Sequence, residues 1–350
     1  MTASYLLTGS YSSEQEQGIK LWEFEDASGE LTELAGIAGI ERPSFLAVHP
    51  NGTSFVATSE VGDGQLVSYW IHPDAKKIVE LNRQSSNGDH PAHLTIDETG
   101  QWLLSVTYSG ATVNVHSLHA DGSIGGLADS VKHEGSGPNK ERQDAAHPHS
   151  AIQVPGKNLF LVSDLGNDTI TTYKLNSETG KLTFQYAVQT EGGAGPRHLS
   201  FHPTKPFVYS LNEINSTLMV YKISQHGQLD FLQLLPLLPD NYQGQNTSAE
   251  IAVSGDGRYV YASNRGHDSI ATFAIQDNGT LENIGLTGAG GEGPRHFAII
   301  PGDEWLVAAN ENSHTLAVLK MGRSGAPCTI ENSVQTTAPV CVKVIRSKRS

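Results

Sequence analysis

The sequence predicts an all-β protein, a seven-bladed β-propeller with four antiparallel strands in each blade. Three observations lead to this prediction. One anchor motif occurs seven times along the chain, at intervals of 45 to 57 residues. The complete copies contain four short strands separated by turn residues, and a unit of roughly 40–50 residues with four strands is typical of a propeller blade. The last copy lacks strands that the N-terminus can supply, so the ring can close.

The anchor motif is a short apolar strand that usually follows a proline. The seven copies begin at positions 43, 91, 148, 196, 248, 294 and 339, and the fourth reads Pro196-Arg-His-Leu-Ser-Phe-His-Pro. A second strand such as Phe207-Val-Tyr-Ser follows, then a third such as Thr217-Leu-Met-Val-Tyr-Lys-Ile, and a fourth lies beyond a further turn. Short alternating segments between turn signals indicate strands. A two-sheet sandwich is the alternative, but it would not produce seven equivalent anchors.

The two ends of the chain are expected to complete one blade together. The last anchor, Pro339-Val-Cys-Val-Lys-Val-Ile, has only its first strand. The segments Tyr5-Leu-Leu-Thr-Gly-Ser-Tyr and Gly18-Ile-Lys-Leu-Trp-Glu-Phe can supply the missing second and third strands. Such closure leaves no stray sheet edge. We therefore expect residues 1–350 to form a single propeller domain.

Composition and charge exclude several classes of protein. The net charge of −14 argues against nonspecific nucleic-acid binding, which requires basic patches. No stretch approaches the roughly 18 apolar residues of a membrane span, and the N-terminus lacks the basic and apolar regions of a signal peptide. We expect a cytoplasmic protein that binds neither nucleic acid nor membrane. The sequence leaves the oligomeric state open.

Repeat positions indicate which mouth of the channel carries the chemistry. The first strand of a blade runs away from its anchor and the second returns, so its end lies at the mouth where the first strand begins. The residues one position after an anchor include His149, Arg197 and Arg295, and those seventeen positions after it include Glu213 and Arg265. A packed propeller needs no charge at these positions. Convergent titratable groups in a concave scaffold are therefore a candidate active site.

A neighbouring ring of repeat positions, one residue further along, adds more polar groups. We take His198, His296 and Glu250 from this ring, together with Arg295, as candidate substrate-binding residues. A structural role is the alternative, and histidine at one recurring repeat position favours it for His198, His296 and the related His93.

An inter-blade ion pair is the corresponding alternative for Arg197 with Glu213. It explains the whole charged set less well, because the charged residue types differ between blades while the framework repeats. Two long insertions, 135–144 and 240–247, connect fourth strands to the next first strands. They therefore lie at the same mouth and could cover a ligand.

Several motifs resemble the lactonase family of seven-bladed propellers, which includes propeller-type 6-phosphogluconolactonases and fungal carboxy-cis,cis-muconate lactonising enzymes. The resemblance covers essentially the whole chain, and its motifs are Ala194–Pro203, Asn212–Ser216, Asp256–Arg265 and Gly293–Phe297. It implies a catalytic set of one His, two Arg and one Glu. The matching positions here are His149, Arg197, Arg265 and Glu213.

The resemblance also implies an enzyme that hydrolyses 6-phosphoglucono-δ-lactone, a small anionic lactone, to 6-phosphogluconate in the pentose phosphate pathway. His149 or Glu213 would be the general base on water. One of Arg197 and Arg265 would stabilise the oxyanion, and the other would hold the phosphate with Arg295. The scattered histidines form no convincing ligand set, so we expect neither a metal nor another cofactor.

Three other functions remain open at this point. The protein could be a muconate-type lactonising cycloisomerase or a lactonase for another sugar lactone, because the same basic mouth suits any carboxylate. It could be a non-catalytic propeller that binds an anionic metabolite or a protein partner. An interaction scaffold of the WD type is the third, but the repeats lack the terminal Trp-Asp dipeptide.

Overall fold

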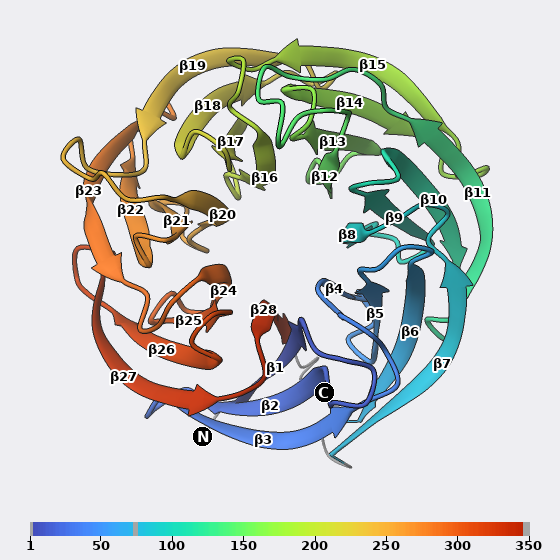
Figure 1. Ribbon diagram of the computed structural model, residues 1–350, viewed down its shortest axis with the longest axis horizontal. Coiled ribbons are helices and arrows are strands. Elements are labelled where there is room, and N and C mark those ends of the chain that lie inside the picture. Colours follow the sequence, from blue (N-terminus) through green and yellow to red (C-terminus); the bar gives the residue numbers. More distant parts are fainter. Residues whose placement is uncertain (1–2, 73–75, 346–350) are drawn as a thin grey trace.

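The computed structural model is a ring of seven four-stranded antiparallel sheets around a central channel (Figure 1). It describes residues 3–72 and 76–345. All regular elements in these residues are strands, and the predicted all-β seven-bladed propeller is confirmed. In each blade, strand order in the sheet follows the path from the channel to the outer wall.

The blades are numbered in chain order from the first complete one. Blade 1 consists of β4 (Leu46–Val48), β5 (Ser54–Ser59), β6 (Gln65–His72) and β7 (Lys77–Ser85). Blade 2 consists of β8 (Pro91–Ile96), β9 (Trp102–Thr107), β10 (Thr112–Leu118) and β11 (Ile124–Lys132). Blade 3 consists of β12 (Pro148–Gln153), β13 (Leu159–Asp164), β14 (Thr169–Leu175) and β15 (Leu182–Gln189).

The second half of the ring repeats this arrangement. Blade 4 consists of β16 (Pro196–Phe201), β17 (Phe207–Asn212), β18 (Thr217–Ile223) and β19 (Leu229–Pro236). Blade 5 consists of β20 (Thr247–Val253), β21 (Tyr259–Arg265), β22 (Ser269–Ile275) and β23 (Leu281–Gly288). Blade 6 consists of β24 (Pro294–Ile299), β25 (Trp305–Asn310), β26 (Thr315–Met321) and β27 (Pro327–Gln335).

Blade 7 is built from both ends of the chain. Its innermost strand is β28 (Pro339–Ile345), which pairs antiparallel with β1 (Ala3–Ser10) and places Thr8 opposite Val342. The strands β2 (Ile19–Glu25) and β3 (Glu30–Ile37) complete the sheet. The N-terminus thus supplies three strands, one more than the sequence analysis assigned. Figure 1 shows the blue and red segments side by side.

A bulge at the start of most innermost strands shapes the mouth of the channel. In β16, Pro196 lies opposite Asn212 and His198 opposite Leu211, so that Arg197 has no partner across the strands. The same shift occurs in β12, β24, β8, β20 and β28. A bulge bends the strand and redirects the extra side chain. The position one residue after the anchor is therefore the bulged one.

Packing between blades combines apolar burial with a repeated hydrogen bond. Large side chains such as Phe24, Phe55 and Phe273 are fully buried, and each contributes about 1.5–3 kcal/mol by leaving water. A polar side chain of one blade also donates to a turn carbonyl of the next. Trp305 donates Nε1–H to the Asp26 carbonyl at 3.0 Å, which ties blade 6 to blade 7.

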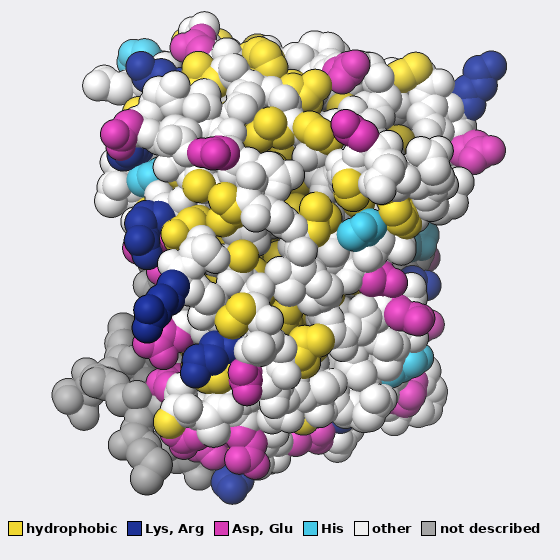
Figure 2. Space-filling model, turned by 90° about the vertical axis from the view of Figure 1, so that its left-hand side faces the viewer, with side chains coloured by type: hydrophobic (Ala, Val, Ile, Leu, Met, Phe, Trp, Pro, Cys, Tyr) yellow, Lys and Arg dark blue, Asp and Glu magenta, His cyan; other side chains and the backbone are white. Residues whose placement is uncertain are grey.

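The outer wall carries apolar side chains in several blades (Figure 2). Phe184, Phe231 and Ile330 on three outermost strands are each more than half exposed, at 59%, 54% and 54%. Figure 2 shows such side chains scattered over the middle of the wall, with charged groups among them and toward the edges. Among residues 3–72 and 76–345, no helix is long and apolar enough to cross a membrane.

Candidate active site

The bulged residues converge on a small cavity at the mouth of the channel. The space that it leaves for the centre of a water molecule is small, about 10 Å³, within about 260 Å³ between atoms that includes open solvent. Most of its wall residues lie one or two positions after an anchor, and Glu60 directly follows β5. The wall consists of Ser44, Phe45, Glu60, Ala92, His149, Arg197, His198, Arg295, His296 and Val340. The mouth selected from repeat positions is therefore where the structure brings these side chains together.

Glu213 is the centre of a buried ion cluster. Its backbone N–H donates to the Gly195 carbonyl directly after β17, which fixes the residue beside the β16 bulge. Its Oε2 lies 2.9 Å from Arg197 Nε and 3.1 Å from Arg265 Nη2. Burial alone would raise the pKa of Glu213, but the positive charges of Arg265, Arg197 and other neighbours hold it well below its ordinary value of 4.5. The carboxylate is therefore ionised, and all of its strong partners are cations.

Arg197 projects from the β16 bulge and is only 3% exposed. Its Nη1 donates to the carbonyl of Ala249 at 2.5 Å, and the Ser163 hydroxyl donates to the Arg197 carbonyl at 2.6 Å. Burial and the charges of Arg265 and Arg295 lower the pKa of Arg197 to about 10. The guanidinium remains charged at neutral pH in a site where water is largely excluded.

His149 projects from the β12 bulge and faces the same cavity. Its ring is 5% exposed, and its Nδ1 is buried without a hydrogen-bond partner in the described chain. Burial and the positive charge of Arg197 lower its pKa well below 6.5. The imidazole is therefore neutral at physiological pH and can accept a proton.

The first long insertion supplies a third guanidinium that the sequence analysis did not identify. Arg142 Nη2 lies 2.6 Å from Glu213 Oε1, and the Arg142 side chain is 37% exposed. Within residues 240–247, all of which the structure describes, no side chain bonds Glu213 or its arginines. The first insertion thus contacts the ion cluster directly, and the expectation that both insertions cover a ligand stays a prediction. Only the first brings a charged group to the site.

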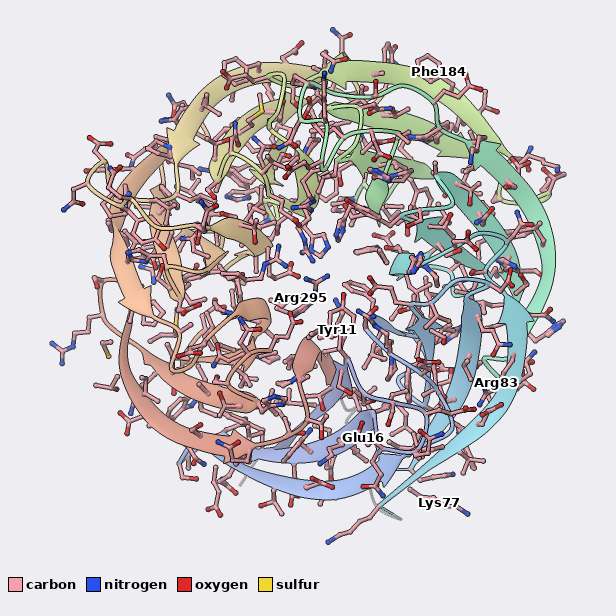
Figure 3. The ribbon with its side chains drawn as sticks, in the orientation of Figure 1. Tyr11, Glu16, Lys77, Arg83, Phe184 and Arg295 are labelled. Carbon is pink, nitrogen blue, oxygen red and sulfur yellow. The ribbon has the colours of Figure 1, made fainter. Side chains whose placement is uncertain are left out.

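A second cluster lies on the opposite side of Arg295. Arg295 Nη2 donates to the Tyr11 hydroxyl at 2.6 Å, and that hydroxyl lies 3.1 and 3.0 Å from the two oxygens of Glu60. The Arg295 guanidinium also lies 3.9 Å from Glu311. Burial raises the pKa of Tyr11 to about 12, so the phenol is protonated. Figure 3 shows Tyr11 and Arg295 near the centre of the ring.

The neighbouring ring forms a layer beneath the mouth. Glu250 Oε2 lies 3.0 Å from His198 Nδ1 and 3.0 Å from His296 Nε2. His93 packs against Phe45, with ring centroids 4.1 Å apart and the planes tilted by 34°. His198 and His296 reach the cavity wall, whereas the carboxylate of Glu250 is engaged by the two imidazoles and does not line the cavity. Glu213, Arg265 and Arg142 likewise lie outside the cavity wall, so substrate binding by Glu250 stays a prediction.

Sequence reasoning missed Tyr11 and Arg142 for different reasons. Tyr11 directly follows β1, just as Glu60 follows β5 and Glu311 follows β25. Aligning the N-terminal strand with the other second strands would have found it as the seventh member of that set. Arg142 belongs to an insertion without a counterpart in other blades, so the repeat carries no signal for it.

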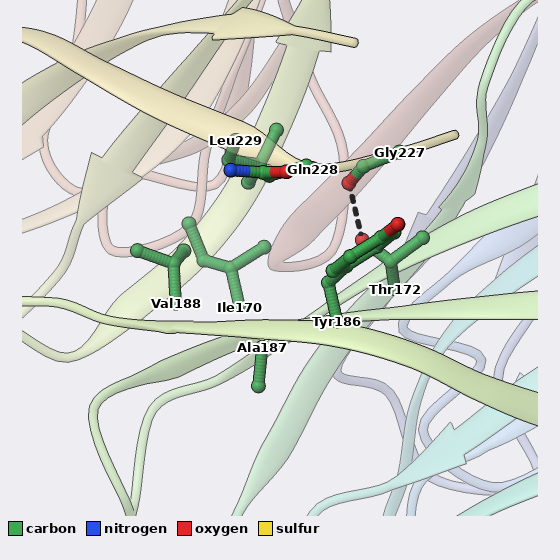
Figure 4. Close-up of a pocket in the computed structure, with 8 residues that line it drawn as sticks. All are labelled: Ile170, Thr172, Tyr186, Ala187, Val188, Gly227, Gln228 and Leu229. Atoms are coloured by element: carbon green, nitrogen blue, oxygen red, sulfur yellow. Dashed lines mark hydrogen bonds between the residues drawn. The ribbon is translucent and has the colours of Figure 1, made fainter. Parts of the chain in front are cut away.

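A larger hollow lies away from this cluster, on the outer side of blades 3 and 4 (Figure 4). It holds about 620 Å³ of open space and is lined by residues such as Ile170, Tyr186 and Leu229. No carboxylate, imidazole or guanidinium lines it. The chemistry therefore assigns the candidate site to the smaller cavity. Among residues 3–72 and 76–345, no three His, Cys, Asp or Glu side chains form a metal-binding group.

The fold and the site together define a seven-bladed propeller with a guanidinium-rich pocket at one mouth. Residues 5–344 match the family model described as "Lactonase, 7-bladed beta-propeller". The chain belongs to this lactonase family.

Relatives of known sequence and structure agree with this assignment. The chain is 31% identical to the 6-phosphogluconolactonase of Bacillus subtilis, over 99% of both sequences. It is 28% identical to a periplasmic gluconolactonase of Pseudomonas aeruginosa, with a TM-score of 0.93 and 99% of both chains covered. A putative 6-phosphogluconolactonase of Bacteroides fragilis is also 28% identical, with a TM-score of 0.91 and 98% of both chains covered.

Proposed function

We propose that this protein hydrolyses 6-phosphoglucono-δ-lactone to 6-phosphogluconate. The names of the Bacillus and Bacteroides relatives support this substrate. The observation that carries the proposal is the buried cluster in which Arg197, Arg265 and Arg142 surround Glu213 beside the neutral His149. Fixed cations in a water-poor site stabilise the charge that develops on an acyl oxygen.

His149 is the proposed general base. Burial or neighbouring cations lower the pKa of both candidates, but the Glu213 oxygens are bound by three guanidiniums, whereas His149 Nδ1 has no hydrogen-bond partner among the described residues. His149 takes a proton from water as the water oxygen bonds to the lactone carbonyl carbon. The tetrahedral intermediate then collapses, the bond between that carbon and the ring oxygen breaks, and the protonated imidazole returns the proton to the departing oxygen.

The arginines divide between the oxyanion and the phosphate. The side chain of Arg197 is 4% exposed, so we assign it to the oxyanion, where a desolvated cation is most effective. Arg265 and Arg142 have side chains that are 14% and 37% exposed, which favours the phosphate at the open end of the site. The planar guanidinium suits a phosphate because two N–H groups can bond two oxygens. Glu213 holds the three side chains in this arrangement.

The test is hydrolysis of freshly prepared 6-phosphogluconolactone, followed by pH-stat with spontaneous hydrolysis subtracted. Wild-type enzyme should accelerate the reaction, and His149→Gln should lower kcat by about 10²–10⁴-fold, as expected for loss of a general base. Arg142→Ala should chiefly raise KM. An absence of acceleration by the folded wild-type protein would overturn the proposal.

The proposed mechanism uses no metal. Incubation of the enzyme with EDTA, followed by buffer exchange, should leave kcat/KM unchanged. Recovery of lost activity on adding back a divalent cation would contradict this part of the proposal. The location of the reaction in the cytoplasm is also proposed, and fractionation of cells that express the full chain tests it.

A further inference from the structure

The mouth has a second polar wall that the proposed mechanism does not use. Glu60 lines the cavity, and among the described residues the Tyr11 hydroxyl is the one side-chain donor within hydrogen-bonding distance of its carboxylate. Because Arg295 donates to the Tyr11 oxygen, the single phenolic proton is directed at Glu60. A carboxylate offers about four acceptor positions, so most of those on Glu60 are available to a molecule in the cavity.

The two sides of the mouth differ in charge. On the His149 side, three guanidiniums face one carboxylate, that of Glu213. On the other side, Glu60 and Glu311 balance Arg295 and Arg42, whose guanidinium lies 4.4 Å from the Tyr11 ring centroid. An anionic group of a ligand is therefore attracted to the first side. The second side, rich in acceptors and without excess positive charge, suits hydroxyl donors.

We propose that Glu60, positioned by Tyr11, accepts hydrogen bonds from ring hydroxyls and makes the site specific for polyhydroxylated lactones. This inference rests on the proposed lactonase function. Binding of the hydroxyls by Glu60 would orient the substrate, with the phosphate toward Arg142 and Arg265 and the hydroxyl-bearing edge toward Glu60. It also disfavours an unsaturated lactone that carries carboxylates, because such a molecule offers no ring hydroxyls and would bring negative charge toward Glu60 and Glu311.

The role is one of recognition and not of proton transfer. A general base would affect hydrolysis of every lactone, whether or not it carries hydroxyls. A hydroxyl acceptor affects only substrates that possess the hydroxyl, since a site built to bind a hydroxyl discriminates against analogues that lack it. The two roles therefore predict different substrate profiles for the same variant.

The experiment measures kcat/KM for glucono-δ-lactone and for δ-valerolactone, which has the same six-membered ring without hydroxyls. Wild-type enzyme should prefer glucono-δ-lactone. Glu60→Gln should lower kcat/KM for glucono-δ-lactone by about 10- to 100-fold, the usual effect of losing a hydrogen bond to a charged group. Its kcat/KM for δ-valerolactone should stay within about 3-fold of wild type, because that substrate has no hydroxyl for Glu60 to bind.

Glu311→Gln is the matched control. It removes the same charge at the equivalent position of blade 6, near the same arginine, but Glu311 does not line the cavity. This variant should retain the preference for glucono-δ-lactone. Tyr11→Phe should reduce the preference, because Glu60 loses the one side-chain donor that the described part of the chain offers it.

The outcomes distinguish failure of the lactonase function from failure of the role proposed for Glu60. If wild-type enzyme accelerates neither lactone nor 6-phosphogluconolactone, the lactonase function fails and this inference fails with it. If wild-type enzyme is active but Glu60→Gln keeps its preference, or loses activity on both lactones equally, only the inference fails. If Glu311→Gln lost the preference for glucono-δ-lactone as fully as Glu60→Gln, the loss would be due to the removed charge. The proposed hydrogen bonds to Glu60 would then be overturned as well. Thermal melts of each variant establish that it is folded.

Discussion

Glu213 is a structural and electrostatic centre as well as a candidate catalytic residue. Three guanidiniums lie within 3.1 Å of its two oxygens, and its side chain is only 6% exposed. Arg265 and Arg295 disfavour the charge of Arg197, as its lowered pKa indicates. The carboxylate therefore offsets a repulsion that the site would otherwise contain.

The Glu213→Gln variant should consequently lose both activity and stability. Removing one partner of a buried ion pair typically costs about 3–5 kcal/mol, because the remaining charges are left uncompensated. Urea denaturation measures the stability change. Glu178→Gln, at an exposed position, is the control and should lie within about 0.5 kcal/mol of wild type. Equal stability of Glu213→Gln and wild type would contradict the account of the cluster.

The pH dependence of kcat/KM should report the buried state of His149. Burial and Arg197 lower its pKa well below 6.5, so the imidazole stays neutral and able to accept a proton as the pH falls through that value. The acid limb should therefore lie below the range of an ordinary histidine. An acid limb centred near pH 6.5 would argue against His149 as the base in this environment.

At the residue scale, the sequence was informative wherever a charged residue interrupted a repeated position. This reasoning placed His149, Arg197, Glu213, Arg265 and Arg295 at one mouth. It could not separate residues that face the cavity from those one layer below, because adjacent positions of a strand differ by a local bulge. Glu250 was accordingly selected although its carboxylate is held between His198 and His296.

At the element scale, the bulges are held in place by aspartates at the ends of neighbouring turns. Asp168 accepts hydrogen bonds from the backbone N–H groups of Gly193 at 2.7 Å and Gly195 at 2.8 Å, just before β16. Asp268 does the same for Gly293 before β24, at 2.8 Å. The segments that carry Arg197 and Arg295 are thus tethered by equivalent interactions.

Asp168→Ala should loosen the approach to the Arg197 bulge. Asp168 is 1% exposed, so the variant leaves two partly buried N–H groups without their acceptor. Each such loss costs about 1–3 kcal/mol. Chemical denaturation should show a stability loss of about 2–6 kcal/mol for the two groups together, and kcat should fall because Arg197 is less well fixed. Asp277→Ala, at a side chain fully exposed to solvent, should change neither quantity.

The strand pattern was predictable from alternation and turns, but the bulges were not. A bulge depends on how two strands register against each other, and that register is absent from the repeat itself. The third strand that the N-terminus contributes, β3, was missed for a related reason. Only one of its eight residues is buried, as expected for the outer strand of a blade, so its apolar signal is weak.

At the scale of the whole molecule, the buried histidines link stability to pH. His93, His149, His198 and His296 all have pKa values well below 6.5, with burial as the main cause. Below pH 6.5 the unfolded chain binds protons at these positions and the folded chain does not. Stability is therefore full above pH 6.5 and falls as the pH decreases, by about 1.4 kcal/mol per pH unit for each such histidine.

Urea denaturation at pH values between 8 and 5 tests this expectation. The free energy of unfolding should be nearly constant at the alkaline end and should decline steeply below pH 6.5. His93→Gln should show a shallower decline, because one of the four groups no longer titrates. A free energy that stayed constant down to pH 5 would contradict the burial of these imidazoles.

The ring itself was the most predictable property of the chain. Seven anchors with equivalent surroundings leave few other arrangements, and the expected pairing of the two ends is the one that the structure has. The repeat encodes closure of the ring, because each blade buries its two faces against the neighbouring blades. The site is less predictable, because it uses features that differ from one blade to the next.

The shared construction of blade 7 has a consequence for how the protein comes into being. During synthesis the ribosome releases β1–β3 first, and their inner edge has no partner until β28 emerges. Tyr11 is tied to the start of that strand, since its backbone N–H donates to the Ala338 carbonyl at 3.0 Å, directly before β28. A chain that lacked β28 would therefore carry most of the blades and still lack a complete mouth.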